Sequence, residues 1–499
     1  MINIGIYFFT RDLSINSDFI KAYNKCDIII PIFNFTPNQI TEKNKYKSNK
    51  ALVFMINSLL HLRDELKSKL DLDLLFLYDT YRNLFNSNFI DDIKELYETT
   101  EDKVEISFYI SKDYTSYAKK RESYLIKSCI KAGITFNSFH NVCLLPPGTI
   151  LTQSEETYKK FTPFYNNFIK NGVNLIKKED LKFVKKQYNE HINKLSDEIK
   201  NIFLLYSDEL KSIDDFYKIA KLSQEEILLY RKNIFIQAPY TTLNDIIIKL
   251  KNGNFKDYEK TRDYMEYSTT RLSCFLKFGL ISVNELFFII KEKYGIQHPL
   301  IRQLIWRDFY YNIGNSYDYV LNHNIENKSF NLDYDKIKWS DNQNELFKYW
   351  STAQTGIPIV DASITELLET GYMHNRMRML VASVLVKQFL VDWRLGEKFF
   401  AQHLIDYDPI INNLNWQFVA SSGSFGFDYF RQLKPEAQNA RFDKNCDYVK
   451  KWLPQLFEIP NKHIIQWEKY HNEHTNVYKA PIQLYDSNKF TNTYKKYVI

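Results

Sequence analysis

The densest group of side chains that could bind a ligand lies in residues 404–424. It contains two aspartates and three asparagines: Asp406, Asp408, Asn412, Asn413 and Asn415. Carboxylates and amides are costly to bury unless they find hydrogen-bond partners. The cluster therefore either builds turns or binds something polar, and its composition predicts an irregular segment.

Residues 371–387 begin with a second polar group and continue as an apolar helix. Asn375, Arg376, Arg378 and Met379 lie where they could contact a ligand. The alternative is an ordinary first helical turn with solvated arginines. His374 has no second histidine at metal-ligand spacing, so we assign it no metal role and expect no metal site.

Residues 268–279 place several hydroxyl side chains directly before an apolar segment with helical spacing. Hydroxyls and free backbone N–H groups at a helix start suit a phosphate or pyrophosphate. Because every helix needs a cap, an ordinary N-cap is the simpler explanation of this stretch taken alone.

The elements that must position these residues fall into two classes. Short β-branched runs occupy residues 2–9 and 26–35, residues 72–79 and 104–110 also have the pattern of strands, and residues 49–70 have apolar positions at helical spacing. Alternating strands and helices predict βαβ units with a parallel sheet. From about residue 214 to about residue 470 the pattern is helical. We expect an α/β N-terminal domain with a Rossmann-like parallel sheet, followed by a larger all-α domain.

The predicted domain boundaries follow these changes of pattern. We expect the α/β domain over residues 1–137, an inter-domain linker over 138–213, the helical domain over 214–480 and a C-terminal tail over 481–499. The linker begins with turn-rich sequence that contains "LLPPGTI" and "FTPFY".

Length and composition limit the class of protein. The chain has 499 residues, of which 44% are hydrophobic and 25% charged, which is typical of a soluble globular protein with more than one core. It contains no apolar run long enough to span a membrane and no signal peptide, so we expect an intracellular location. Its five cysteines lack pair spacing, and its net charge of +6 permits a polyanionic partner.

Several stretches together resemble the DNA photolyase and cryptochrome family, and most closely its class I cyclobutane pyrimidine dimer photolyases. They are "RDL" at residues 11–13, "DYTSYAKKRE" at 113–122, the run from "TGIPIVDAS" to "GEKFF" at 355–400, and "YVKKWLPQL" at 448–456. The resemblance implies an antenna domain, a helical domain that holds a U-shaped FAD, and a monomeric enzyme acting on ultraviolet-damaged DNA.

The resemblance implies a set of flavin contacts. Those to the FAD phosphates are Tyr258, Thr269, Thr270, Arg271, Leu272 and Ser273. Those that enclose the isoalloxazine and adenine are Trp306, Arg378, Asp406 and Asp408. Asn412 matches the asparagine beside the flavin nitrogen that gains a proton on reduction.

Three tryptophans match the family's electron-transfer chain from FAD to the surface, in the order Trp416, Trp393 and Trp339. Trp339 requires a one-residue gap relative to the usual spacing to Trp350. A single tryptophan at such a position would usually be core packing, so the inference depends on the three positions together.

The same resemblance implies a DNA-binding face. Trp306 and Phe418 flank a flipped pyrimidine dimer, and Asn375 and Met379 contact its bases. The predicted phosphate contacts are Arg262, Arg376 and Arg431. Flipping a damaged dinucleotide costs little because the lesion already stacks poorly, and photolyases are a standard example of base-flipping enzymes.

Two departures from class I leave the lesion open. Gln303 replaces the usual active-site glutamate, and Phe418 replaces a second stacking tryptophan. Glutamine at this position is typical of (6-4) photolyases, but those enzymes carry histidines where this chain has Asn375 and Met379. We therefore expect cyclobutane dimers as the substrate, with a (6-4) photolyase as the alternative.

A cryptochrome, a blue-light receptor without repair activity, is the other alternative. Signalling members typically add a long C-terminal extension, and here few residues follow residue 470, so we expect an enzyme. Folate-binding class I enzymes use an Asn-Glu pair where this chain has Tyr117 and Ala118. A second antenna chromophore, of the folate or deazaflavin type, therefore stays unidentified.

Overall fold

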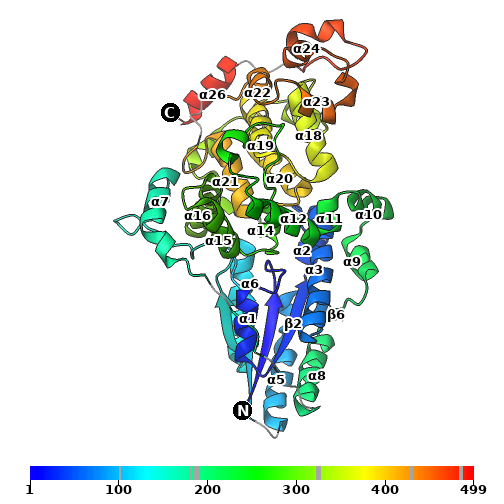
Figure 1. The fold of residues 1–499 in the computed structure, drawn as a ribbon, viewed down its shortest axis with the longest axis vertical. Coiled ribbons are helices and arrows are strands. Elements are labelled where there is room, and N and C mark those ends of the chain that lie inside the picture. The colour runs from blue at the N-terminus through cyan, green and yellow to red at the C-terminus, as the bar shows by residue number, and fades with distance from the viewer. Residues whose placement is uncertain are drawn as a thin grey trace. The chain divides into compact units, whose positions relative to one another are not determined.

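The computed structural model describes residues 1–100, 103–178, 181–184, 186, 190–321, 327–426, 431–482 and 487–498 (Figure 1). The chain forms two compact units. Unit 1 comprises Met1–Ile150, Tyr165–Lys251 and Leu272–Tyr311, and unit 2 comprises Leu151–Phe164, Asn252–Arg271 and Asn312–Ile499.

A mostly parallel sheet forms the centre of unit 1. Its strands are β1 (Ile2–Phe9), β2 (Ile28–Phe35), β3 (Leu75–Tyr78), β4 (Val104–Ser111), β5 (Thr135–Phe139) and β6 (Asp208–Glu209). They lie in the order β5-β4-β1-β2-β3-β6, and only the short β6 runs antiparallel to its neighbour. This topology confirms the predicted α/β class, although the sequence analysis did not identify β5 and β6.

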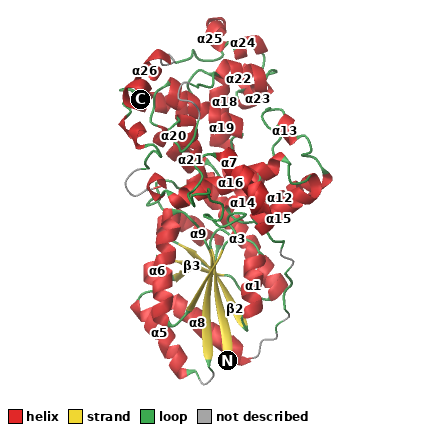
Figure 2. Cartoon of the chain, turned by 90° about the vertical axis from the view of Figure 1, so that its left-hand side faces the viewer, coloured by secondary structure: helices red, strands yellow, loops and turns green. Residues whose placement is uncertain are grey.

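Helices cover both faces of this sheet, as Figure 2 shows. Alternate residues of a strand point to opposite faces. Phe8 of β1 packs into the core under α5 (Ser87–Thr99), α6 (Ser116–Ala132) and α8 (Glu190–Leu205). Its neighbours Tyr7 and Phe9 instead pack on Phe19 of α1 (Ser17–Lys25).

The other helices wholly in unit 1 are α2 (Pro37–Ile40), α3 (Asn49–Leu70), α4 (Tyr81–Leu84), α9 (Ile213–Ala220), α10 (Gln224–Arg231), α11 (Ile234–Gln237), α14 (Ser273–Lys277) and α15 (Val283–Tyr294). Three more, α7 (Phe161–Asn167), α12 (Pro239–Asn252) and α16 (Pro299–Ser316), run across a unit boundary. The helix predicted over residues 49–70 is confirmed by α3, which Ser48 caps through its side chain.

The "RDL" motif follows strand β1 and contacts α14 and the turn after it, all within unit 1. Arg11 forms an ion pair of 3.2 Å with Asp113 and donates to the carbonyl of Lys277. A Cβ atom on Gly279, which has a φ of +62°, would lie 2.1 Å from the carbonyl oxygen of Arg11. The contact therefore requires glycine on both steric and backbone grounds.

Unit 2 is helical, as predicted for this part of the chain. Its α-helices are α13 (Tyr258–Thr261), α17 (Gln343–Ser351), α18 (Pro358–Thr370), α19 (Asn375–Ser383), α20 (Trp393–His403), α21 (Pro409–Ala420), α22 (Pro435–Phe442), α23 (Asp447–Trp452), α24 (Asn461–Ile465), α25 (Trp467–Tyr470) and α26 (Ser487–Val498). A π-helical segment, η5 (Val384–Gln388), continues α19. The core of the unit packs around Trp350, Trp393 and Trp416.

The prediction of an irregular segment over residues 404–424 was wrong for Pro409–Ala420, which form α21, whereas the residues on either side are irregular. Pro409 starts α21, and the Asp408 carboxylate accepts hydrogen bonds from the N–H groups of Ile410 and Ile411. An N-cap aspartate followed by proline is a strong helix start. It outweighs the low helix propensity of the asparagines, which occupy interior positions of this helix.

None of the described helices combines the length and apolar character needed to cross a bilayer. The five cysteines are all buried and carry free thiols.

Candidate active site

A charge pair anchors the candidate site in unit 2. The guanidinium of Arg378, on α19, lies 2.9 Å from Oδ2 of Asp406 and donates through Nε to the carbonyl of Met373. The other oxygen of Asp406, Oδ1, is buried and has no hydrogen-bond partner among the described residues. A buried carboxylate oxygen without a donor is costly, so this oxygen is a candidate acceptor for a polar group of a bound ligand.

The hydroxyl segment at residues 268–271 does not cap a helix. α14 begins at Ser273, and no side chain caps its N-terminus. Thr269 instead shares a hydrogen bond of 3.1 Å with the hydroxyl of Tyr372. Arg271 has a φ of +51° and lies over the same Tyr372 ring. The ordinary N-cap explanation is therefore wrong for this segment.

Glu366 lies close to the Arg271 side chain. One of its carboxylate oxygens is 4.0 Å from the Arg271 guanidinium, and the other accepts a hydrogen bond of 2.8 Å from Tyr448. Burial raises the pKa of Glu366, against the hydrogen bond from Tyr448 and the charge of Arg271, which lower it.

Asn412 is paired with a buried acid. Its Nδ2 donates to Oε1 of Glu397 over 3.2 Å and to the backbone carbonyl of Glu397 over 3.1 Å. Desolvation raises the pKa of Glu397 to about 8, because the hydrogen bonds from Asn412 and Asn327 only partly offset it. At neutral pH the carboxyl group of Glu397 is therefore protonated, and it lies within hydrogen-bond distance of the Asn412 amide.

The three tryptophans of the predicted chain all belong to unit 2. Trp393 and Trp416 are buried in its core, and Trp339 is half-buried and packs against the same core. The indole Nε1 of Trp393 is buried without a hydrogen-bond partner among the described residues. Trp416 and Trp393 are equally buried, and Trp339 is the more exposed of the three, so the order of the proposed electron-transfer chain stays a prediction.

Asp408 and Tyr258 have more local surroundings. Asp408 is buried and committed to capping α21. Tyr258 begins the short helix α13, and burial raises the pKa of its phenol to about 12. The role of Asp408 that the structure shows is therefore to start helix α21.

Gln303 and Trp306 lie three residues apart on α16, in the part of that helix that belongs to unit 1. Residues at this spacing share a helix face. Both are half-buried, and Trp306 packs near Phe309 and Tyr310. The helix is fixed by Asp308, whose carboxylate accepts hydrogen bonds of 3.0 Å from the N–H groups of Leu144 and Leu145.

The predicted DNA-contacting residues of unit 2 have distinct partners. Asn375 and Met379 stand one turn apart on α19, with Asn375 Nδ2 3.7 Å from the Met379 sulfur. Arg376 pairs with Asp263 at 2.7 Å, and Arg262 pairs with Glu259 at 3.1 Å. Phe418 packs against Phe425 on the half-buried side of α21.

Arg431 is exposed, and its carbonyl accepts a hydrogen bond from Lys387. The arginines at 262 and 376 would have to share their charge between a carboxylate and a phosphate. Arg431 is the most accessible of the three.

Sequence reasoning missed Glu366, Tyr372 and Glu397. Tyr372 and Glu366 lie just before the recognised cluster at residue 375, and Glu397 is four residues after Trp393. Glu397 lies in a segment that also contains Arg394 and Lys398, so no signal in the sequence indicated that this acid is buried.

The described residues fit a flavin dinucleotide on two observations. Asp406 Oδ1 awaits a donor, and Arg271 and Arg378 both lie over the Tyr372 ring, at 4.4 and 5.6 Å from its centroid. The Arg271 guanidinium could bind the pyrophosphate through paired hydrogen bonds, while Arg378 and Asp406 offer a donor and an acceptor to the rings.

Comparison with known proteins agrees with this fit. Residues 300–497 match the family model described as the FAD binding domain of DNA photolyase, and residues 6–178 match the model described as DNA photolyase. The chain is 30% identical over 484 residues to a deoxyribodipyrimidine photo-lyase of Buchnera aphidicola subsp. Acyrthosiphon pisum, covering 94% of this chain and 91% of the relative.

Two solved structures extend the comparison. An archaeal photolyase from Sulfolobus tokodaii is 30% identical with a TM-score of 0.70, and the match covers 99% of this chain and 100% of the other. A cryptochrome from Synechocystis matches with a TM-score of 0.74 over 99% of both chains, but at 22% identity it shows the fold alone. The chain belongs to the DNA photolyase family, and it is a lyase that carries the family's FAD-binding domain.

Proposed function

We propose that this protein repairs cyclobutane pyrimidine dimers in DNA, acting as a monomer under light. The observation that carries the choice of lesion is the pair Asn375 and Met379 on α19. The (6-4) reaction requires a histidine acid at these positions to donate a proton. An amide and a thioether cannot do so.

The nearest histidine does not replace that acid. His374 is buried and uses Nδ1 to accept the N–H of Arg376 as the cap of α19. Desolvation lowers its pKa to about 4, against the charge of Asp263, which raises it. His374 is therefore neutral at physiological pH and a poor general acid.

The residues of this chain bind and orient the reactants. When bound, reduced FAD supplies one electron to the dimer on illumination. We propose that Arg378 and Asp406 hold the ring system, while Thr269, Thr270, Arg271, Leu272, Ser273 and Tyr258 hold the phosphates. Trp306 and Phe418 flank the flipped dimer, and Asn375 and Met379 contact its bases.

Gln303 donates a hydrogen bond to a thymine carbonyl of the dimer in this proposal. A preorganised donor stabilises negative charge as it develops on that oxygen. The amide donates without needing a shifted pKa, whereas a carboxylic acid must be held neutral by its pocket. Gln303 should therefore act over a wide pH range, although less strongly than an acid.

Trp416, Trp393 and Trp339 supply electrons to oxidised FAD and take no part in splitting the lesion. Asn412 would present its amide to the bound flavin, and Glu397 orients that amide by accepting two hydrogen bonds from its Nδ2. A second chromophore is a separate part of the proposal. The Sulfolobus tokodaii structure is described as holding two FAD molecules, with a novel light-harvesting cofactor implied.

The test of the lesion uses two DNA duplexes, one with a cyclobutane dimer and one with a (6-4) product. Each is illuminated with pre-reduced protein, and the restored thymines are counted. We expect repair of the cyclobutane dimer alone. Repair of the (6-4) product alone would reverse the assignment of Gln303. Light-driven flavin reduction without repair of either lesion would indicate a signalling protein.

A further inference from the structure

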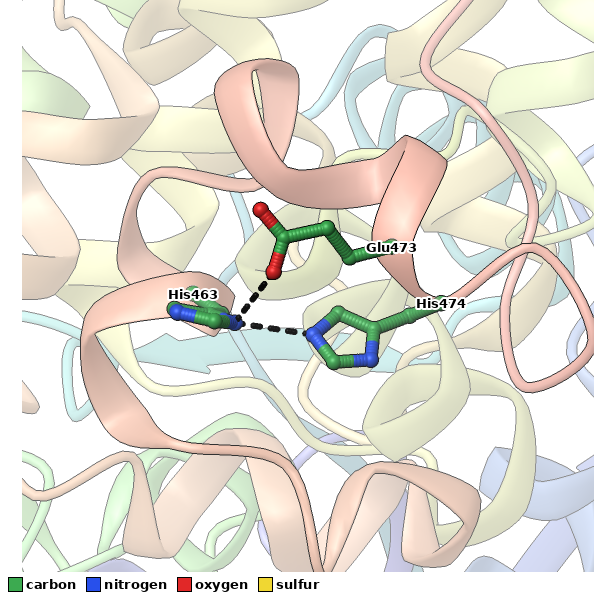
Figure 3. A group of neighbouring side chains, drawn as sticks. All are labelled: His463, Glu473 and His474. Carbon is green, nitrogen blue, oxygen red and sulfur yellow. Dashed lines mark hydrogen bonds and ion pairs between the residues drawn. The ribbon is translucent and has the colours of Figure 1, made fainter.

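A group of three side chains outside the candidate active site has the composition of a metal site. His463 lies on α24, and Glu473 and His474 lie at the end of the 3-10 turn His471–Glu473 (Figure 3). Nδ1 of His463 is 2.8 Å from Nε2 of His474 and 3.8 Å from Oε2 of Glu473. All three ligand atoms lie within 4.8 Å of one another.

Both imidazole rings are held in place by aromatic neighbours. His463 stacks on Tyr470 with ring centroids 4.1 Å apart and an interplanar angle of 4°. His474 faces the buried Trp467, whose indole N–H donates to the carbonyl of Lys479. Because packing already orders both rings, directing their nitrogens toward a common position costs little further conformational entropy.

We propose that His463, Glu473 and His474 bind a divalent ion of the zinc class. Two imidazole nitrogens and one carboxylate are typical protein ligands of Zn²⁺, and three protein ligands leave a fourth position for water. Ligand nitrogens about 2.0–2.1 Å from a tetrahedral ion lie about 3.3 Å apart. The two rings must therefore separate by about half an ångström from their 2.8 Å spacing.

A hydrogen bond between two neutral imidazoles is the competing explanation of the 2.8 Å distance. That bond needs only one proton and two nitrogens, and it gives a part to Glu473 only if His463 is protonated. The carboxylate is itself more than half exposed, and Figure 3 shows it directed toward His463. An ion explains the convergence of all three groups.

The bound ion would fasten α24 to the turn that follows α25. Between these ligands the chain contributes Trp467 and Ile464 to the core of unit 2. The carbonyl of His474 also accepts the N–H groups of Val477 and Tyr478. Because an ion that binds only the folded state stabilises it, binding should raise the melting temperature of this unit.

The test uses tag-free FAD-loaded protein, kept oxidised and in the dark. Zn²⁺ is titrated by calorimetry, and Co²⁺ is titrated by its visible d–d absorption, at wavelengths longer than oxidised flavin absorbs. We expect saturable uptake of one ion per chain, a higher melting temperature with Zn²⁺, and reversal by a chelator.

Three variants locate the site. His474→Gln should weaken Zn²⁺ binding by more than the roughly 10–100-fold typical of losing an outer-sphere partner, and Glu473→Gln should weaken it less. His471→Gln is the matched control, since His471 Nδ1 meets the carbonyl of Glu468 instead. If His474→Gln does not fold, which loss of bound FAD would reveal, His463→Gln is measured instead.

Absence of saturable binding in the wild type would overturn the proposal. So would equal weakening by His471→Gln and His474→Gln. Neither result depends on repair activity, so failure here is distinct from failure of the proposed function.

Discussion

Trp416 packs so closely on Gly396 that a Cβ atom added to this glycine would lie 2.2 Å from Cη2 of the indole ring. Gly396 belongs to α20, and Trp416 belongs to α21. Only a residue without a side chain lets these helices meet at this tryptophan. Trp416, the first residue of the proposed electron-transfer chain, thus packs directly against the backbone of α20 at Gly396.

Gly396→Ala should therefore displace Trp416 and slow light-driven reduction of FAD. Overpacking in a core typically costs about 1–3 kcal/mol of unfolding free energy, and alanine's better helix propensity returns about 1 kcal/mol. Ala401→Gly in the same helix is the control for lost stability without added volume. Photoreduction at the wild-type rate in Gly396→Ala would show that the position of Trp416 does not matter.

Trp393→Phe should largely block photoreduction of oxidised FAD and leave repair by pre-reduced protein nearly unchanged. The reason is that this residue relays electrons to the flavin and does not contact the lesion. Trp452→Phe, which alters a partly buried tryptophan outside the proposed chain, serves as the control. The measurement is flavin absorbance under illumination with an external reductant. Equal rates in Trp393→Phe and wild type would contradict the relay.

Glu397 should make the stability of the protein fall as pH rises. Its pKa of about 8 in the folded state lies above the value of about 4.3 expected in the unfolded chain. The folded state thus binds this proton more tightly. The resulting stabilisation is complete below about pH 4 and is lost as pH rises through 8.

Glu397→Gln removes this proton and keeps an acceptor for Asn412. Between pH 5 and 8, the unfolding free energy of the wild type should fall more steeply than that of the variant, by up to about 1.4 kcal/mol per pH unit. Denaturant titrations at several pH values measure both slopes. Other acids are unchanged between the two proteins, so parallel slopes would mean that Glu397 is ionised throughout.

The sequence predicted the elements whose patterns are local. The helix over residues 49–70 and the strand over residues 2–9 were found because apolar periodicity and β-branched runs report directly on burial. α21 was missed because its asparagines disfavour a helix, while the Asp408 cap and tertiary packing decide the outcome. β5 and β6 were missed because they are short and weakly patterned.

The candidate site shows the same division. Arg378 and Asp406 were both expected among the residues that enclose the flavin rings, and the structure brings them together as an ion pair of 2.9 Å. The role of Glu397 could not be inferred, because it depends on a contact with Asn412, which lies on another helix. The group of His463, Glu473 and His474 has no recognised ligand spacing, and only the fold brings its members together.

DNA binding should depend on salt through the predicted arginines. Neutralising Arg431 should weaken damaged and undamaged DNA alike and reduce the salt slope by about one unit. Arg376→Gln should reduce it by less than one unit, because Asp263 already neutralises part of that charge. Arg231→Gln, on the exposed side of α10, is the control. An unchanged slope in Arg431→Gln would remove this residue from the interface.

The number of thymines restored per absorbed photon, on a duplex with one cyclobutane dimer, tests the central claim most directly. Pre-reduced wild-type protein should repair the dimer in light and not in darkness, with little change between about pH 6 and 9. Gln303→Glu should raise the yield, and Gln303→Leu should lower it with FAD still bound. No restored thymine from FAD-loaded, pre-reduced wild type under illumination, or loss of repair in Gln303→Glu, would contradict the assignment of this protein to cyclobutane dimers.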